Sequence, residues 1–279
     1  MALSIHTNYS ALTTNTALNK SNNALATNQQ RLGTGLRINS AADDAAGLQI
    51  ATRLNAQSRG MSVAMRNVGD ATSMLQTAEG AFSEATDILQ RMKDLSTQAA
   101  NGTNAAKDLT ALDAEFTELG KELTNIVTNT KYAGEALFTG KLAADVNFQI
   151  GASSTEVMTV AAADTGIAAT VTALGTTVQA LGIDTGAGAT AAITALEGAL
   201  DQVGTTRAAF GANINRLNHT SNNLANMKDN TEMAKGRIMD ADFAMESANM
   251  SKNSMLMQSG ISMLKQAGQM PGMVMGLLG

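Results

Sequence analysis

Apolar residues recur at every seventh position along several long stretches of this 279-residue sequence. This spacing places them along one side of an α-helix, where they can pack against a second helix. Proline, which breaks the interior of helices, occurs only once in the chain, so that helices of many turns are unobstructed. We therefore expect a mainly α-helical protein built from long antiparallel, coiled-coil-like helices.

The clearest row of apolar residues begins at Met61. Its large residues alternate with small ones, mostly alanine, three positions further on. Small residues let a partner helix approach closely, while large ones fill the space between the backbones. A second row, late in the chain, supplies the partner. The residues predicted to form this core are Met61, Val68, Leu75, Phe82, Leu89, Leu196, Val203, Phe210, Leu217 and Leu224.

The two ends of the chain carry narrower apolar stripes among Asn, Ser, Thr and Gln residues. One thin stripe against another buries too little surface to hold two helices of about 30 residues rigid in water, so these ends need partners beyond their own chain. The last helix is expected to stop near Gly268, before Pro271, and to leave a short apolar tail. The residues expected to pack in this way are Leu18, Leu25, Leu32, Phe243, Met250, Met257, Leu264, Leu277 and Leu278.

Between about residues 140 and 190 the pattern changes from helical to alternating. Val146, Phe148 and Ile150 alternate with polar residues, and a turn-forming segment separates them from the β-prone residues 157–160. This pattern predicts a small β-hairpin. Helices precede and follow it, so that the N- and C-terminal helices are expected to pair at one end of the fold.

Composition and charge exclude several classes of function. The sequence has no cysteine, which excludes disulfides, thiolate nucleophiles and Cys-ligated metals. The net charge is −5 and no run of Lys and Arg occurs, which disfavours a nucleic-acid partner. The N-terminus does not resemble a cleaved secretory signal, and no apolar run approaches the ~20 residues that span a bilayer. We expect no cofactor, no metal and no membrane span.

Few sequence motifs support an enzymatic function. Residues 186–191 match the pattern G-x-G-x-x-A of dinucleotide-binding sites, but no second βαβ unit follows them. The adjacent acids Asp43 and Asp44 would point about 100° apart on a helix, which is poor geometry for acid–base chemistry, and we interpret them as helix-start acids or interface charges. We predict that the protein is not an enzyme. The alternative is a dinucleotide-binding oxidoreductase built on Gly186 and Gly188.

Longer motifs carry a family resemblance. Residues 31–48, with the sequence RLGTGLRINSAADDAAGL, closely resemble the signature of bacterial flagellins. Similar matches occur at residues 5–8, 215–220, 237–244 and 277–279, and the resemblance covers about residues 1–140 and 195–279. It implies a structural subunit that self-assembles into the hollow helical filament of the bacterial flagellum for motility. The short middle and His6 also resemble lateral-type flagellins.

The resemblance implies a domain organisation and a set of partners. Residues 1–44 and 236–279 would form inner terminal helices, and residues 45–235 a helical core domain that contains a surface-facing variable segment at 140–190. Subunits would be exported unfolded by the flagellar type III system, with an export chaperone at the C-terminal region. The filament, an extracellular homopolymer, would meet hook–filament junction and cap proteins at its ends. Such a junction or cap protein is also an alternative identity for the chain, since it shares the end-helix pattern.

The resemblance extends to an immune-receptor site. Residues 89–98 look like the segment that animal Toll-like receptor 5 recognises in many flagellins. Arg91 and Leu95 match that segment directly, and Glu115 matches an acidic residue contributed by the following helix. Lys93 and Asp94 depart from the pattern. The resemblance therefore implies that this receptor recognises the chain.

Overall fold

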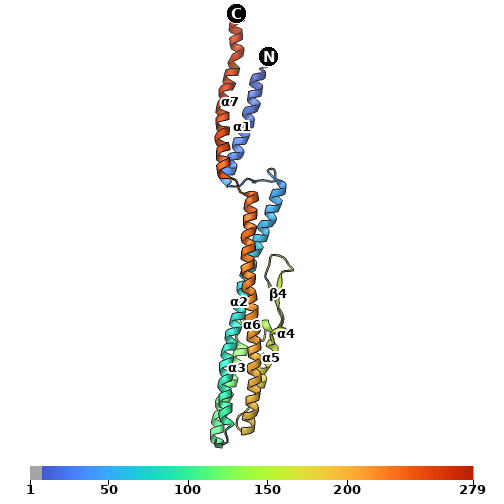
Figure 1. Cartoon of the computed structure of the whole chain (residues 1–279), viewed down its shortest axis with the longest axis vertical. Helices are drawn as coiled ribbons and strands as arrows, with labels where there is room; N and C mark the ends of the chain where they lie inside the picture. The colour runs from blue at the N-terminus through green and yellow to red at the C-terminus, as the bar shows by residue number, and fades with distance from the viewer. Residues whose placement is uncertain (1–7, 279) are drawn as a thin grey trace. The chain divides into compact units, whose positions relative to one another are not determined.

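The computed structural model describes residues 8–278, with the side chains of Met270, Pro271 and residues 273–278 left out of the description. The main helices are α1 (Tyr9–Thr34), α2 (Ala45–Ala99), α3 (Ala106–Asn129), α6 (Gly186–Met239) and α7 (Phe243–Leu278). Shorter elements are β1 (Lys131–Tyr132), β2 (Glu135–Ala136), η1 (Lys141–Ala143), β3 (Val146–Gln149), β4 (Val157–Val160), α4 (Ala162–Thr165), α5 (Ile167–Thr172) and the π-helical turn η2 (Ala173–Thr177). The predicted fold class, long helices with a small β-hairpin and paired terminal helices, is confirmed (Figure 1).

The chain divides into two compact units. One, here called the terminal unit, contains the residues up to Ala56 together with those from Asn230 onward. The other, here called the central unit, is Gln57–Asp229. Each has its own internal contacts, and the long helices α2 and α6 contribute residues to both.

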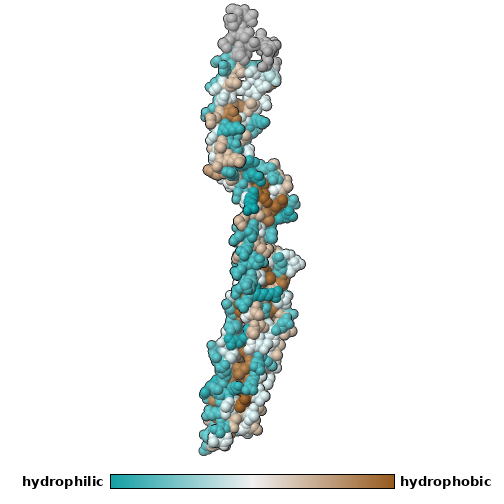
Figure 2. Space-filling model, in the orientation of Figure 1, coloured by the Kyte–Doolittle hydropathy of each residue, from teal (hydrophilic) through white to brown (hydrophobic). Residues whose placement is uncertain are grey.

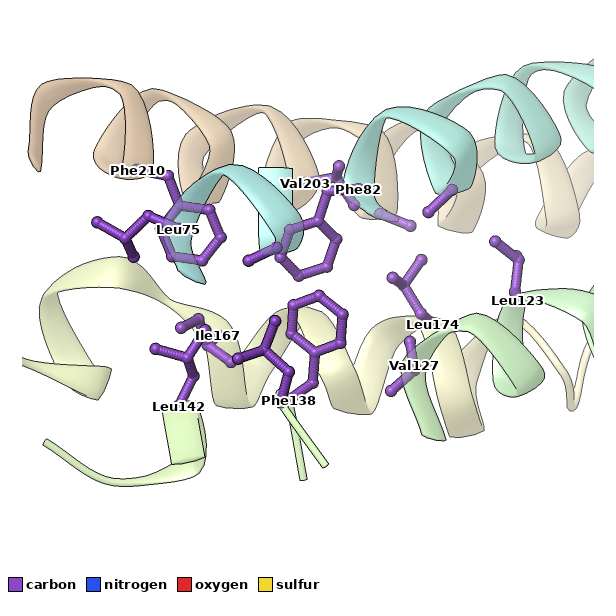
Figure 3. Close-up of a cluster of buried hydrophobic side chains, with 14 of the residues drawn as sticks. Leu75, Phe82, Leu123, Val127, Phe138, Leu142, Ile167, Leu174, Val203 and Phe210 are labelled. Atoms are coloured by element: carbon purple, nitrogen blue, oxygen red, sulfur yellow. The ribbon is translucent and has the colours of Figure 1, made fainter. Parts of the chain in front are cut away.

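The core of the central unit lies between α2, α3 and α6. The large side chains spaced by seven on α2 and α6 are all at most 5% exposed, and Ala64, Ala71, Ala78 and Ala85 between them are at most 1% exposed. Phe82 of α2 lies beside Phe138 and Phe210, with ring centroids 4.6 and 5.9 Å away, so that three aromatic rings meet at one level of the core (Figure 3). The alternation of large and small residues therefore coincides with close helix packing.

Two antiparallel hairpins follow α3. The predicted hairpin forms from β3 and β4, with Val146 opposite Val160 and Gln149 opposite Val157. A second hairpin, β1 with β2, was not predicted. Its two-residue turn places Ala133 and Gly134 at φ 51° and 86°, a conformation that usually selects Asn or Gly at both positions, so the sequence carries little signal for it.

The segment after the hairpin closes the core from one side. Residues 161–183 had weak signals in the sequence, but α4, α5 and η2 give them a mostly helical path. Ile167, Leu174, Val178 and Ile183 are each at most 1% exposed, and Leu174 points toward Leu123 and Val127 of α3 (Figure 3). One face of this segment is therefore part of the hydrophobic core, while its other face is exposed.

In the terminal unit α1 and α7 lie side by side and antiparallel (Figure 1). The expectation that the last helix stops near Gly268 is wrong, because α7 continues through Pro271 to Leu278. Proline has no N–H to donate to the carbonyl of Ala267, four residues earlier. The side-chain amide of Asn8 donates to that carbonyl instead, at 2.6 Å, and its oxygen accepts from the Ala11 N–H to cap α1. A contact distant in sequence thus replaces the missing hydrogen bond.

Candidate assembly surface

The loop between α1 and α2 is held by a short strand-like contact with the α6–α7 connection. Gly35 ends α1 in the left-handed conformation, at φ 73°. The Arg37 N–H then donates to the Met239 carbonyl at 2.7 Å, and the Ala241 N–H donates to the Gly35 carbonyl at 3.0 Å. The two connections of the terminal unit therefore support each other.

The adjacent acids Asp43 and Asp44 organise the start of α2. Asp43 accepts from the backbone N–H groups of Asn39 and Ser40 at 3.0 and 2.9 Å, and these hydrogen bonds lower its pKa, so that it is ionised at neutral pH. Asp44 accepts from the Gly47 N–H at 2.8 Å and caps the helix. A Cβ on Gly47 would lie 2.5 Å from the Asp44 carboxylate, so a larger residue there would displace the capping side chain. Both acids thus act at a helix start.

The contact between α1 and α7 is one row of side chains from each helix, spaced alternately by three and four residues. Gly260 allows a close approach there, since a Cβ in its place would come within 2.9 Å of Leu18. On α1 the row is Ala11, Thr14, Leu18, Ser21, Leu25, Asn28 and Leu32, and on α7 it is Glu246, Met250, Asn253, Met257, Gly260, Leu264 and Ala267. Because many of these residues are small or polar, the row buries little apolar surface for its length.

A polar cluster interrupts this row near one end of the helix pair. The Arg31 guanidinium contacts the Glu246 carboxylate at 3.1 Å, and Glu246 is only 8% exposed. With its amide oriented to satisfy its neighbours, Asn28 donates to the other oxygen of Glu246 and accepts from Asn253, both at 3.1 Å. Sliding one helix along the other would leave these buried groups unpaired, so the cluster favours a single alignment of α1 and α7.

Most of the residues predicted to pack between subunits lie between α1 and α7 of one subunit. Leu18, Leu25, Leu32, Met250, Met257 and Leu264 are half-buried between α1 and α7. Phe243, at the start of α7, is 69% exposed. The side chains of Leu277 and Leu278 lie outside the described residues.

A group of large apolar residues faces solvent on the same helix pair, and the heptad pattern predicted only one of them, Phe243. These residues are here called the exposed apolar set, and Figure 2 shows hydrophobic residues at the surface among hydrophilic ones. Several directly precede a half-buried residue of the row, as Leu256 precedes Met257, and this widening of the apolar stripe was the available signal. The exposed apolar set is Leu12, Phe243, Met245, Met255, Leu256, Ile261 and Met263, each between 42% and 69% exposed.

A shallow groove of about 330 Å³ runs between α1 and α7. Ala17 and Leu18 line it from α1, and Leu256, Gly260 and Met263 line it from α7, together with Thr and Ser side chains. Small and apolar walls of this kind accept another helix at close range. The groove is continuous with the exposed apolar set, since Leu256 and Met263 belong to both.

The residues of the predicted receptor site lie on the central unit. The Arg91 guanidinium of α2 donates twice to Glu115 of α3, at 2.9 and 2.6 Å, and their side chains are 55% and 45% exposed. Leu95, one turn along α2, is only 1% exposed. Lys93 contacts Glu197 of α6 at 3.0 Å. Arg91 and Glu115 are therefore brought together at the surface, while Leu95 lies beneath it.

Comparisons with known proteins decide the family. The bacterial flagellin N-terminal helical region matches residues 5–143, and the bacterial flagellin C-terminal helical region matches residues 193–278. The chain belongs to the bacterial flagellin family. It is 34% identical over 384 aligned positions to polar flagellin C of Vibrio parahaemolyticus and 37% identical over 301 positions to the flagellin of Bacillus subtilis. These alignments cover 100% of this chain and 100% of the Vibrio protein, and 98% of this chain and 99% of the Bacillus protein.

One solved flagellin structure aligns with part of this chain. A crystal structure of Bacillus cereus flagellin is 37% identical to this flagellin and aligns with a TM-score of 0.49 over 57% of this chain and 88% of that chain. The alignment with the Vibrio relative has more positions than this flagellin has residues, so that relative carries additional residues without a counterpart here. This flagellin is thus a short form that lacks a large outer domain.

Family membership fixes the general function. Flagellins are structural proteins rather than enzymes, and they polymerise into the filament of the bacterial flagellum, which is extracellular. Gly186 and Gly188 open the long helix α6 after a loop, without a preceding strand, so they do not form a dinucleotide site. Within residues 8–278, no helix is long and apolar enough to cross a membrane, and no cluster of His, Asp and Glu could hold a metal.

Proposed function

We propose that the terminal unit of this flagellin forms the inner part of the filament and that neighbouring copies cover its exposed apolar set. In this arrangement residues 1–44 and 236–279 are the inner helices, and residues 45–235, with the variable segment 140–190, lie outside them. The observation that carries the proposal is the exposure of seven large apolar side chains on one pair of helices. Because each is already partly buried, covering the rest of each side chain would contribute about 1–2 kcal/mol to association.

The half-buried leucines and methionines of the α1–α7 row have a different role in this proposal. They hold the two helices together within one subunit, and their remaining exposed surface adds to the contact with neighbours. The central row from Met61 to Leu89 on α2, with its partners on α6, forms the core of the central unit.

The test is polymerisation of a variant with Leu256→Asp and Met263→Asp. Both side chains line the groove, and two charges there would have to be desolvated by a neighbouring copy. We expect the critical concentration for polymerisation to rise by at least about tenfold, while thermal unfolding of the central unit is unchanged. Sedimentation and electron microscopy measure the first quantity, and circular dichroism measures the second.

A matched variant controls for added charge. Asn23→Asp with Gln30→Asp places the same two charges, seven residues apart as Leu256 and Met263 are, on exposed positions of α1 opposite the row that packs against α7. This control is expected to polymerise nearly as the unmodified protein does. Equal loss of polymerisation in both variants, or none in the first, would show that the exposed apolar set is not the assembly surface.

We also propose that the subunit is secreted unfolded by the flagellar type III system. A chain without cysteine, whose end helices meet along one thin row, offers little resistance to unfolding. The exposed apolar set of α7 gives an export chaperone a surface to bind at the C-terminal region before assembly. Hook–filament junction and cap proteins would contact the same terminal helices at the two ends of the filament.

Recognition by Toll-like receptor 5 is the remaining proposal. Arg91 and Glu115 are exposed enough to contact the receptor, and Leu95 supports them from below. We expect Arg91→Ala with Glu115→Ala to lower the potency of the dissociated subunit on receptor-expressing reporter cells by about tenfold, the effect of losing ~1.4 kcal/mol. Lys121→Ala, which removes another exposed ion pair of α3, should leave potency unchanged. Equal potency of all three proteins would contradict the proposal.

A further inference from the structure

The methionines of this flagellin range from buried to mostly exposed. In the central unit Met61, Met74, Met92 and Met158 are at most 4% exposed and belong to the core. In the terminal unit Met250 and Met257 are half-buried, and four other methionines are exposed. Met233 of α6 and Met245, Met255 and Met263 of α7 are between 55% and 66% exposed.

The three exposed methionines of α7 lie where a neighbouring copy would pack. Met245 and Met263 are five helical turns apart and therefore point to the same side of α7, in nearly the same direction as Leu256. Met263 also lines the groove between α1 and α7. Met255 points to another side of the helix, so that more than one neighbour can meet a thioether. In the free subunit water and small oxidants reach all three sulfurs.

Thioethers suit such a surface chemically because they are flexible and apolar, but they are also oxidisable. Hydrogen peroxide transfers one oxygen atom to the sulfur lone pair. The O–O bond breaks, one water molecule leaves, and the sulfur loses two electrons while the peroxide gains them. The resulting sulfoxide is polar, and it disrupts methionine-rich contacts.

We propose that Met245, Met255 and Met263 form an oxidation-sensitive site that controls polymerisation: peroxide converts them to sulfoxides in the free subunit and blocks assembly, whereas neighbouring copies shield them in the filament. This inference rests on the proposed function of the exposed apolar set. Sulfoxides are reduced by methionine sulfoxide reductases, so the block is reversible.

The experiment uses the full chain, dissociated from filaments and exposed to dilute hydrogen peroxide. Peptide mass spectrometry should find sulfoxide at Met245, Met255 and Met263 well before it appears at Met61, Met74, Met92 or Met158. Seeded polymerisation, followed by light scattering, should slow by about tenfold or more. Treatment with both reductases, one for each sulfoxide epimer, should restore the rate. Intact filaments given the same dose should remain unoxidised at the three α7 positions.

A variant with all three methionines replaced by leucine assigns the effect. Leucine keeps a similar volume and apolar character, so the variant should polymerise before treatment and stay competent after it. Loss of polymerisation in the oxidised variant, equal to that of the natural sequence, would overturn the assignment to these residues. Equal oxidation in filaments and free subunits would overturn the shielding.

The oxidation experiment and the aspartate variant together distinguish a failure of this inference from a failure of the proposed assembly surface. Suppose that the oxidised natural protein polymerises normally, while the double variant Leu256→Asp with Met263→Asp does not polymerise. The proposed assembly surface is then correct, and the proposed oxidation site is wrong. If the aspartate variant polymerises normally as well, both are wrong.

Discussion

Replacement of Phe82 by alanine is expected to lower the free energy of unfolding of the dissociated subunit by about 3–5 kcal/mol. Phe82 is fully buried, and its ring contacts the rings of Phe138 and Phe210. Its loss removes apolar contacts and leaves a cavity where α2, α6 and the segment after α3 meet, and none of these long elements can move in to fill it. Denaturant unfolding followed by circular dichroism measures the change.

Glu84→Ala is the matched control, because Glu84 lies two positions further along the same helix and is exposed. This substitution should change the unfolding free energy by no more than about 0.5 kcal/mol. A similar small effect for Phe82→Ala would mean that the three rings are not the centre of the core.

Leu174→Ala is expected to cost about 2–5 kcal/mol, although it lies in the segment with the weakest sequence pattern. Leu174 is fully buried in the π-helical turn η2 and faces Leu123 and Val127 (Figure 3). A surface segment that did not contribute to the core would tolerate this substitution. The same unfolding measurement on the dissociated subunit distinguishes the two cases.

Thr177→Ala tests whether the effect belongs to the buried face alone. Thr177 is exposed in the same turn and should be replaceable within about 0.5 kcal/mol. If Leu174→Ala is equally neutral, residues 161–183 do not contribute to the stability of the central unit, and their burial has no energetic consequence.

Much of the fold could be predicted because its pattern is local and periodic. The spacing of Leu75, Phe82 and Leu89 on α2 specifies a helix face without reference to any other element. The alternation around Val146 and the break at Gly35 are equally local. Such signals need only neighbouring residues, and the structure follows them.

The features that sequence reasoning missed depend on residues far apart in the chain. Local rules predict that a helix stops at Pro271, because the Ala267 carbonyl loses its hydrogen-bond donor. The Asn8 amide, from the other end of the chain, donates to that carbonyl. The pairing of α1 with α7 was expected, but the alignment fixed by Arg31, Asn28 and Glu246 was not. Leu256 became a candidate for the assembly surface only when the neighbouring row was seen to pack against α1. A heptad pattern predicts the helix face that packs within one subunit. It does not predict which other faces contact neighbouring subunits.

The hydrogen bond from Asn8 to Ala267 makes the two extremities of the polypeptide depend on each other. One side chain both begins the first helix and lets the last helix pass its proline. A ribosome makes residue 8 long before residue 267, so this mutual support is missing during nearly all of synthesis. Ordering of the helix pair is therefore among the last events in the maturation of each molecule.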